Sequence, residues 1–167
     1  MVVLALDVGQ ARIGVAVGDE SGVLASPHGV VRRRSNAAAI AEIERLYRAA
    51  GATALVIGLP ISLDDRLHGQ AHAVQEFGRR VAAALGVAPI YWDERYSTVT
   101  AAERLRAAGV KPARIKERID AVAAAIILQE YLDDARQRSG ALQAAAAADG
   151  DGDERGPDGG AARGGEV

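Results

Sequence analysis

Three short apolar segments, each closed by a glycine, a proline or an acidic residue, constrain the fold of this chain more than any other feature. They cover residues 2–6, 54–58 and 88–92. Continuous runs of β-branched and apolar residues of this length are typical of strands buried on both faces of a sheet. Between the second and third runs the apolar residues recur with helical spacing, which is typical of α/β domains. The sequence therefore predicts an α/β fold.

Two further strands are predicted near the N-terminus. Residues 12–17 alternate apolar and small residues, and residues 23–31 form a weaker strand interrupted by Pro27. Short glycine-containing joints connect these segments to the first strand, which favours an antiparallel meander. Helices are predicted from an N-cap at Asn36 to Gly51, from about Gln70 to Gly86, over 98–108 and over 118–134. We therefore expect a mixed sheet that is covered by helices on both faces.

Composition narrows the possible chemistry. A chain of 167 residues fits one domain, and the absence of cysteine excludes disulfides, thiol nucleophiles and thiolate metal sites. With three histidines, any metal would be held by oxygen ligands. The N-terminus lacks a basic region and a long apolar run, and no segment approaches the length of a membrane span. We therefore expect a soluble cytoplasmic protein that does not bind membranes.

The balance of acidic and basic residues changes near residue 138. Residues 139–167 contain two of the 20 basic residues and six of the 22 acidic ones. This segment is rich in alanine, glycine and aspartate, and it lacks the branched and aromatic residues needed to form a core. Its alanine run could extend a helix. We predict a domain over 1–138 and a low-complexity, acidic, disordered tail over 139–167.

Three carboxylates are the candidate catalytic residues. Asp7 follows the first apolar strand, Glu94 follows the last one, and Asp120 lies in an otherwise apolar helix next to alanines. Ligands of open α/β sheets bind at the carboxyl ends of the strands. The alternatives are a turn aspartate for Asp7, a local ion pair of Glu94 with Arg95, and a solvent-facing Asp120 near the first turn of its helix.

An oxygen-only set of three carboxylates suits Mg²⁺ or Mn²⁺. Two such cations can activate water and stabilise the leaving oxygen in phosphodiester hydrolysis. This chemistry requires no nucleophilic side chain, which agrees with the lack of cysteine and the scarcity of histidine.

Four segments, taken in order, resemble motifs of the YqgF/RuvX family. They are an opening LDVGQARIGVAV over 6–17, VIGLP over 56–60, DERYST over 93–98 and a closing helix over 119–132. Together they cover about residues 1–134. The loop over 61–69 departs from the Asp-Gly-Thr-like turn of many relatives, and the acidic tail lies outside the family pattern.

This resemblance implies a ribonuclease H-like fold with a mixed five-stranded sheet, and a nuclease that acts on pre-16S rRNA or on Holliday junctions. It places the acidic, metal-binding site on Asp7, Glu94 and Asp120. We favour RNA as the substrate, and branched DNA is the alternative. The sequence does not distinguish a monomer from a homodimer, although a resolvase of symmetric junctions would dimerise.

Basic residues near these acids are the candidate substrate contacts. Arg12, Arg95 and Lys116 are predicted to border the acidic site and to meet phosphates. Residues 32–34, three successive arginines, could follow a nucleic-acid backbone or could reflect the arginine-rich composition of the chain.

Two other functional classes are compatible with parts of the sequence. Sugar kinases and actin-like ATPases also open with Asp-x-Gly, but they need two such domains to enclose a nucleotide. A non-catalytic nucleic-acid-binding module could keep the same fold. That alternative is disfavoured because all three carboxylates are present.

Overall fold

A computed structural model describes residues 1–60, 65–93, 103, 106, 107, 109 and 111–149. The chain divides into two compact units, Met1–Asp134 and Ala135–Val167. Among the described residues, no helix is both long enough and apolar enough to cross a membrane.

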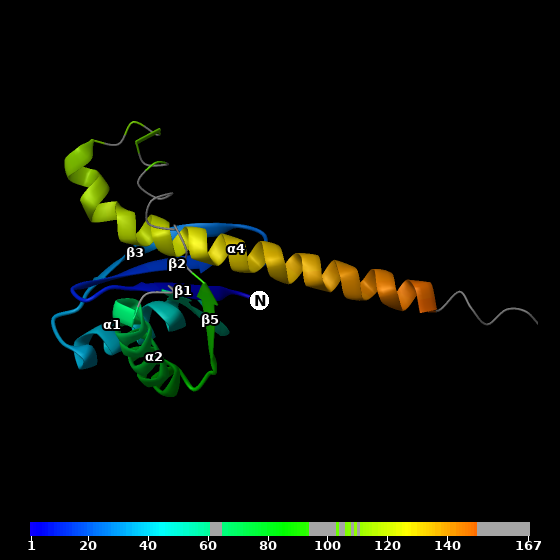
Figure 1. Cartoon of the computed structure of the whole chain (residues 1–167), viewed down its shortest axis with the longest axis horizontal. Helices are drawn as coiled ribbons and strands as arrows, with labels where there is room; N and C mark the ends of the chain where they lie inside the picture. Colours follow the sequence, from blue (N-terminus) through cyan, green and yellow to red (C-terminus); the bar gives the residue numbers. More distant parts are fainter. Residues whose placement is uncertain (61–64, 94–102, 104–105, 108, 110, 150–167) are drawn as a thin grey trace, which may run out of the picture. The chain divides into compact units, whose positions relative to one another are not determined.

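The first unit contains a five-stranded mixed sheet in the order β3-β2-β1-β4-β5 (Figure 1). The three N-terminal strands pair antiparallel, and β4 and β5 extend the sheet in parallel from β1. This arrangement confirms the predicted meander followed by parallel strands. The bounds are Val3–Val8 for β1, Arg12–Gly18 for β2, Ala25–Arg32 for β3, Ala54–Leu59 for β4 and Pro89–Asp93 for β5.

Two helices, α1 (Asn36–Ala49) and α2 (Asp65–Leu85), cover one face of the sheet (Figure 1). Ile43 of α1 and Phe77 and Val81 of α2 are buried against strand residues such as Leu6 and Ile57. The helical spacing of these apolar residues provides the stripe that removes this face from water.

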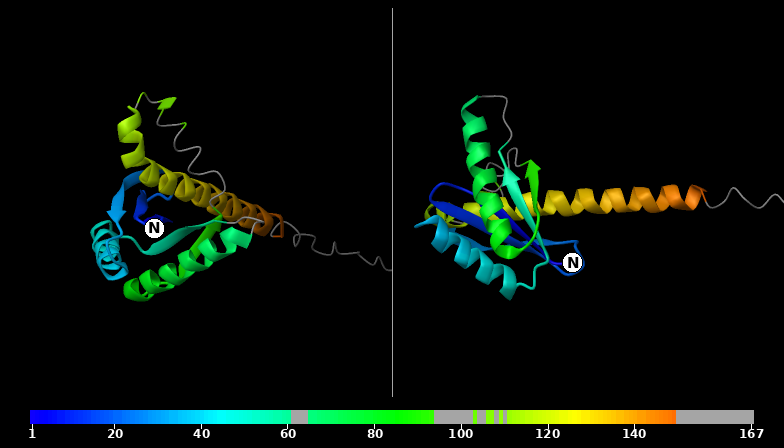
Figure 2. Two further views of the ribbon diagram at one scale, coloured as in Figure 1. Left: turned by 60° about the vertical axis from the view of Figure 1, so that its left-hand side comes forward. Right: turned by 90° about the horizontal axis from the view of Figure 1, so that it is seen from below.

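Helix α4 (Pro112–Asp149) covers the opposite face with its part in the first unit (Figure 2). Its residues Ala124, Ile127 and Leu128 are fully buried against Val3 and Val56. Helices therefore lie on both faces, and the predicted mixed five-stranded α/β fold is confirmed.

The ends of several elements differ from the sequence prediction. The N-cap of α1 is Ser35 rather than Asn36, because the Ser35 hydroxyl accepts the backbone N–H of Ala38 at 3.1 Å. Helix α2 begins at Asp65, ahead of the apolar stripe that predicted a start near Gln70. The helix predicted over 98–108 lies mostly outside the described residues.

Helix α4 is longer than predicted at both ends. It begins at Pro112, and proline is favoured at the first helical position because its missing N–H would have no partner there. It continues to Asp149 through the alanine run of the predicted tail. Residues 150–167 lie outside the described part of the chain.

Strand β3 is the edge of the sheet next to β2. Its pairing with β2 shifts register between Val15 and Ala16, where Ala16 comes to lie opposite Pro27. Proline has no backbone N–H to donate to a ladder and is confined to edge strands and bulges. The irregularity anticipated from Pro27 is therefore present, and the strand continues past it to Arg32.

Candidate active site

Asp7 lies near the end of β1 and faces the side of the sheet that α4 covers. Its neighbours at alternate positions, Val3 and Ala5, belong to the core formed with α4, whereas Leu4 and Leu6 belong to the opposite core. Because successive strand residues point to opposite faces, Asp7 shares the face of Ala5. Its partner in the antiparallel ladder is Gly14 of β2. Gly14 therefore lies on that face as well.

Helix α4 approaches the sheet very closely at Gly14. A β-carbon built on Gly14 would lie 1.9 Å from the backbone carbonyl oxygen of Asp120 and 2.9 Å from the backbone nitrogen of Ala121. No side chain fits in that space. The lack of a side chain at Gly14 thus places Asp120 against the strand pair that carries Asp7. Two of the three predicted catalytic acids, Asp7 and Asp120, thus each lie next to Gly14.

The side chain of Asp120 forms an ion pair with Arg12 of β2. The Nε atom of Arg12 donates to Oδ2 of Asp120 at 2.7 Å, and the Asp120 side chain is only 20% exposed. Because α4 begins at Pro112, Asp120 is beyond the first turn of the helix. The alternative of a solvent-facing acid near the first turn is therefore wrong. The positive charge that compensates this half-buried carboxylate is the Arg12 guanidinium.

The turn between β1 and β2 is held by a hydrogen bond of its own and by two more from Arg33. Within it, the Gly9 N–H donates to the Arg12 carbonyl at 2.9 Å, and a β-carbon on Gly9 would lie 2.6 Å from that same oxygen. The Arg33 backbone N–H donates to the Ala11 carbonyl at 2.9 Å, and Nη1 of Arg33 donates to the Gly9 carbonyl at 3.1 Å. The turn that follows Asp7 is thereby fixed to the end of β3.

The remaining predicted site residues are only partly covered by the structure. Glu94 and Arg95 lie outside the described residues, and so does most of the DERYST segment. Lys116 is in α4, four residues before Asp120, but its side chain is not described. Within the described part of the chain, no three His, Cys, Asp or Glu side chains are grouped closely enough to hold a metal ion.

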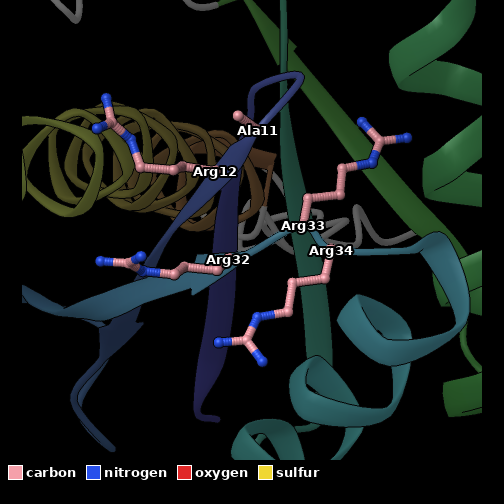
Figure 3. Close-up of a pocket in the computed structure, with 5 residues that line it drawn as sticks. All are labelled: Ala11, Arg12, Arg32, Arg33 and Arg34. Atoms are coloured by element: carbon pink, nitrogen blue, oxygen red, sulfur yellow. The ribbon is translucent and has the colours of Figure 1, made fainter.

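Four arginines surround a hollow of about 350 Å³ beside the turn that follows Asp7 (Figure 3). Arg33 extends toward α2, where its guanidinium lies 4.4 Å from the centroid of the Phe77 ring, whereas Arg12 and Arg32 extend toward the side of α4 (Figure 3). The hollow is lined by Ala11, Arg12, Arg32, Arg33 and Arg34.

A second basic hollow, of about 380 Å³, lies at the start of α4. It is lined by Gly109, Lys111, Arg114 and Arg118. The sequence analysis did not single out Arg114 and Arg118. The spacing of three and four residues from Lys111 through Arg114 to Arg118 is the signal that could have identified them, since it places basic residues on one face of a helix.

Comparison with known proteins agrees with the family resemblance of the four sequence motifs. The family model "RuvX: Holliday junction resolvase" matches residues 1–134. A protein of Chloroflexus aurantiacus named "Putative pre-16S rRNA nuclease" is 43% identical over 132 residues, which cover 79% of this chain and 86% of that protein. A protein of Chloroflexus aggregans with the same name is 45% identical over 131 residues, covering 78% and 92%.

Among solved structures, T. thermophilus RuvC in complex with Holliday junction substrate aligns with a TM-score of 0.49 and 16% identity, covering 79% of this chain and 93% of that chain. The match of the RuvX model over the first 134 residues includes the opening motif, the arginine hollow and Asp120. This chain belongs to the RuvX family.

Proposed function

We propose that this chain is a divalent-metal-dependent nuclease that hydrolyses phosphodiester bonds in RNA, with precursor 16S rRNA as the favoured substrate. The observation that supports it most directly is the placement of Asp7 and Asp120 on one face of the sheet, on either side of Gly14. Asp7 and Asp120 come from separate elements and both neighbour Gly14 near the end of the central strand, in the region where α/β sheets bind ligands.

The donors present fit a hard cation. The described pair supplies carboxylate oxygens alone, which Mg²⁺ and Mn²⁺ prefer. The ion pair with Arg12 uses Oδ2 of Asp120 and leaves Oδ1 outside that contact. We propose Asp7, Glu94 and Asp120 as the metal ligands.

A divalent cation bound to these carboxylates would lower the pKa of water and offset the charge of the attacked phosphate. The protein's own groups would hold the substrate in position. Arg12 binds Asp120 and also lines the arginine hollow. Its guanidinium is therefore placed to contact a substrate phosphate while its Nε remains bound to Asp120. Arg95 and Lys116 stay predicted contacts of the same kind.

The names of the relatives favour an RNA substrate, and a nuclease of ribosomal precursors would act in the cytoplasm. Branched DNA is the second candidate, because the description of the matching family names Holliday junctions. A non-catalytic nucleic-acid-binding module is the third.

A parallel cleavage assay tests the proposal. Precursor rRNA, an unrelated single-stranded RNA and a four-way DNA junction are each incubated with the full chain in Mg²⁺, Mn²⁺ or EDTA, and Asp7→Asn serves as the inactive control. We expect metal-dependent cleavage of precursor rRNA that Asp7→Asn abolishes. Preferential cutting of the junction would select the resolvase alternative. Binding without cleavage in either metal would contradict a nuclease.

A further inference from the structure

We propose that Arg32 and Arg34, together with Arg12, form a docking site for the phosphate backbone of the nucleic-acid strand next to the acid pair. This inference rests on the proposed function for the identity of the polyanion. It assigns to the end of β3 a role separate from the chemistry at Asp7 and Asp120.

The first observation is the register of β2 and β3. Arg12 and Arg32 are directly opposite each other in this antiparallel ladder, and both extend to the side of α4 (Figure 3). Like charges at directly opposite positions of a sheet destabilise it. Asp120 pairs with Arg12 through its Nε and offsets part of this repulsion. An anion bound by Arg32 would offset the rest.

The second observation is the contrast with arginines elsewhere on the surface. Arg45, Arg48 and Arg79 each form an ion pair at 2.7 Å with a glutamate three or four residues away. In the described part of the chain, Arg32 and Arg34 are exposed and pair with no carboxylate. Their charge is therefore available to a ligand, whereas that of the helix arginines is largely compensated.

The third observation is that the site is fixed in place. Arg33, between the two exposed arginines, donates from Nε to Oδ1 of Asn36 at 2.9 Å and from Nη1 to the Gly9 carbonyl at 3.1 Å, and it also lies over Phe77. These contacts hold the segment against α1, α2 and the turn after Asp7. Because the backbone around Arg32 and Arg34 is already ordered, binding a phosphate costs little additional ordering.

The position also suits a strand that passes the acid pair. Strands in a sheet are about 5 Å apart and residues rise about 3.3 Å each, so Arg32 and Asp7 are separated by roughly 12 Å between Cα atoms. A nucleic-acid strand with its scissile phosphate at the acids would place a neighbouring phosphate over the arginine hollow. Arginine is suited to this task because its planar guanidinium can bind phosphate through two hydrogen bonds.

Binding of a fluorescent single-stranded RNA 20-mer to the full chain tests the inference without any need for cleavage. Affinity is measured in EDTA between 50 and 300 mM KCl. The test variant is Arg32→Gln/Arg34→Gln. The matched control is Arg45→Gln/Arg79→Gln, which also removes two positive charges, but from other exposed positions. Melting curves verify that both variants fold.

We expect the test variant to bind RNA about 10-fold or more weakly at 50 mM KCl and the control to change by less than about 3-fold. Loss of two phosphate contacts should also reduce the slope of log K against log [salt] by about 1.4, since each single-strand contact contributes about 0.7. Equal weakening of both variants, or of neither, would overturn the docking site. If the wild-type chain binds RNA but never cleaves it, the proposed nuclease function fails while this comparison still decides the docking site.

Discussion

Gly14 of β2 and Asp120 of α4 are in such close contact that a β-carbon on Gly14 would lie 1.9 Å from the Asp120 carbonyl oxygen. The backbone of the helix therefore rests directly on the strand, with no side chain between them. This contact determines how far the Asp120 carboxylate lies from the Asp7 strand. The site thus depends on a residue that has no functional group of its own.

The first prediction is that Gly14→Ala severely destabilises the protein. The added methyl group would overlap the backbone of α4, and it is itself attached to the backbone of β2, so it cannot move away. The loss of stability should therefore exceed the 1–3 kcal/mol that is typical of overpacked cores. Gly29→Ala in the adjacent strand is the control, because its β-carbon would meet nothing within 4 Å. We expect the melting temperature of Gly14→Ala to fall by roughly 10 °C or more and that of Gly29→Ala to change little. Similar melting temperatures for both variants would contradict this contact.

The second prediction concerns the Arg12–Asp120 ion pair. A double-mutant cycle with Arg12→Gln and Asp120→Asn should show a coupling energy of about 0.5–1 kcal/mol, because the pair is partly shielded from water. Urea unfolding of the two single variants, the double variant and the wild type measures it. The same cycle on the exposed Arg79–Glu76 pair should give a smaller value. Zero coupling between Arg12 and Asp120 would contradict a stabilising ion pair.

The third prediction separates catalysis from folding at Asp120. Asp120→Asn should reduce cleavage by orders of magnitude while RNA binding survives, because it removes a negative charge that the proposed metal site needs. If repulsion among the three proposed metal-binding carboxylates acted alone, Asp120→Asn would leave the stability of the metal-free protein unchanged or raise it. The ion pair with Arg12 instead predicts a modest loss, of about 1 kcal/mol. Cleavage rates and melting curves from one preparation measure both effects, and full activity would refute a catalytic role.

The fourth prediction is a pH dependence at the β2–β3 hairpin. The Asp19 carboxylate accepts hydrogen bonds from the Ser21 hydroxyl and from the backbone N–H groups of Val23 and Leu24, which lower its pKa from 3.8 to about 2. A carboxylate with a depressed pKa stabilises the folded state above its unfolded pKa and loses that contribution as pH falls toward its folded pKa. The stability difference between wild type and Asp19→Asn should therefore be constant above about pH 4 and shrink between 3.8 and 2. Urea unfolding at several pH values measures it, and a difference that persists to pH 2 would exclude Asp19 as its source.

The fifth prediction concerns the acidic tail. Removal of residues 139–167 should leave the melting temperature of the domain nearly unchanged, because Met1–Asp134 forms a compact unit of its own. If the tail competes with substrate for basic residues, RNA binding of the truncated chain should tighten, most clearly at low salt. Calorimetry and the RNA-binding assay measure the two effects. Unfolding on truncation would show that the segment supports the domain.

Much of the fold could be predicted because its strands have simple patterns. The runs that become β1 and β4 are short and apolar, and burial on both faces produces that composition. The similar run of β5 lies at the edge of the sheet and is only partly buried. Helix ends were less predictable. The apolar stripe of α2 starts after the helix itself, and the N-cap of α1 is one residue earlier than expected, because caps depend on a single local hydrogen bond.

The sequence predicts which types of residue form the candidate site better than it predicts the contacts between them. Asp7 and Asp120 were identified from a strand end and from an acid in an apolar helix. The role of Arg12 as the partner of Asp120 depends on a contact across 108 residues, which no local pattern contains. The contact between Gly14 and α4 cannot be predicted from the sequence for the same reason. A glycine in a strand indicates that another segment packs closely there, but it does not identify that segment.

The irregular pairing of β3 also limits how two copies of this chain could associate. An exposed edge strand can accept a strand from another molecule and so continue the sheet. In β3, Pro27 lacks the donor that such a ladder needs, and the register shift next to it disturbs the regular spacing of the backbone groups. Sheets that continue from one copy to the next through this edge, and the aggregates that grow from them, are therefore disfavoured. The outer strand can still lie beside the proposed nucleic-acid site.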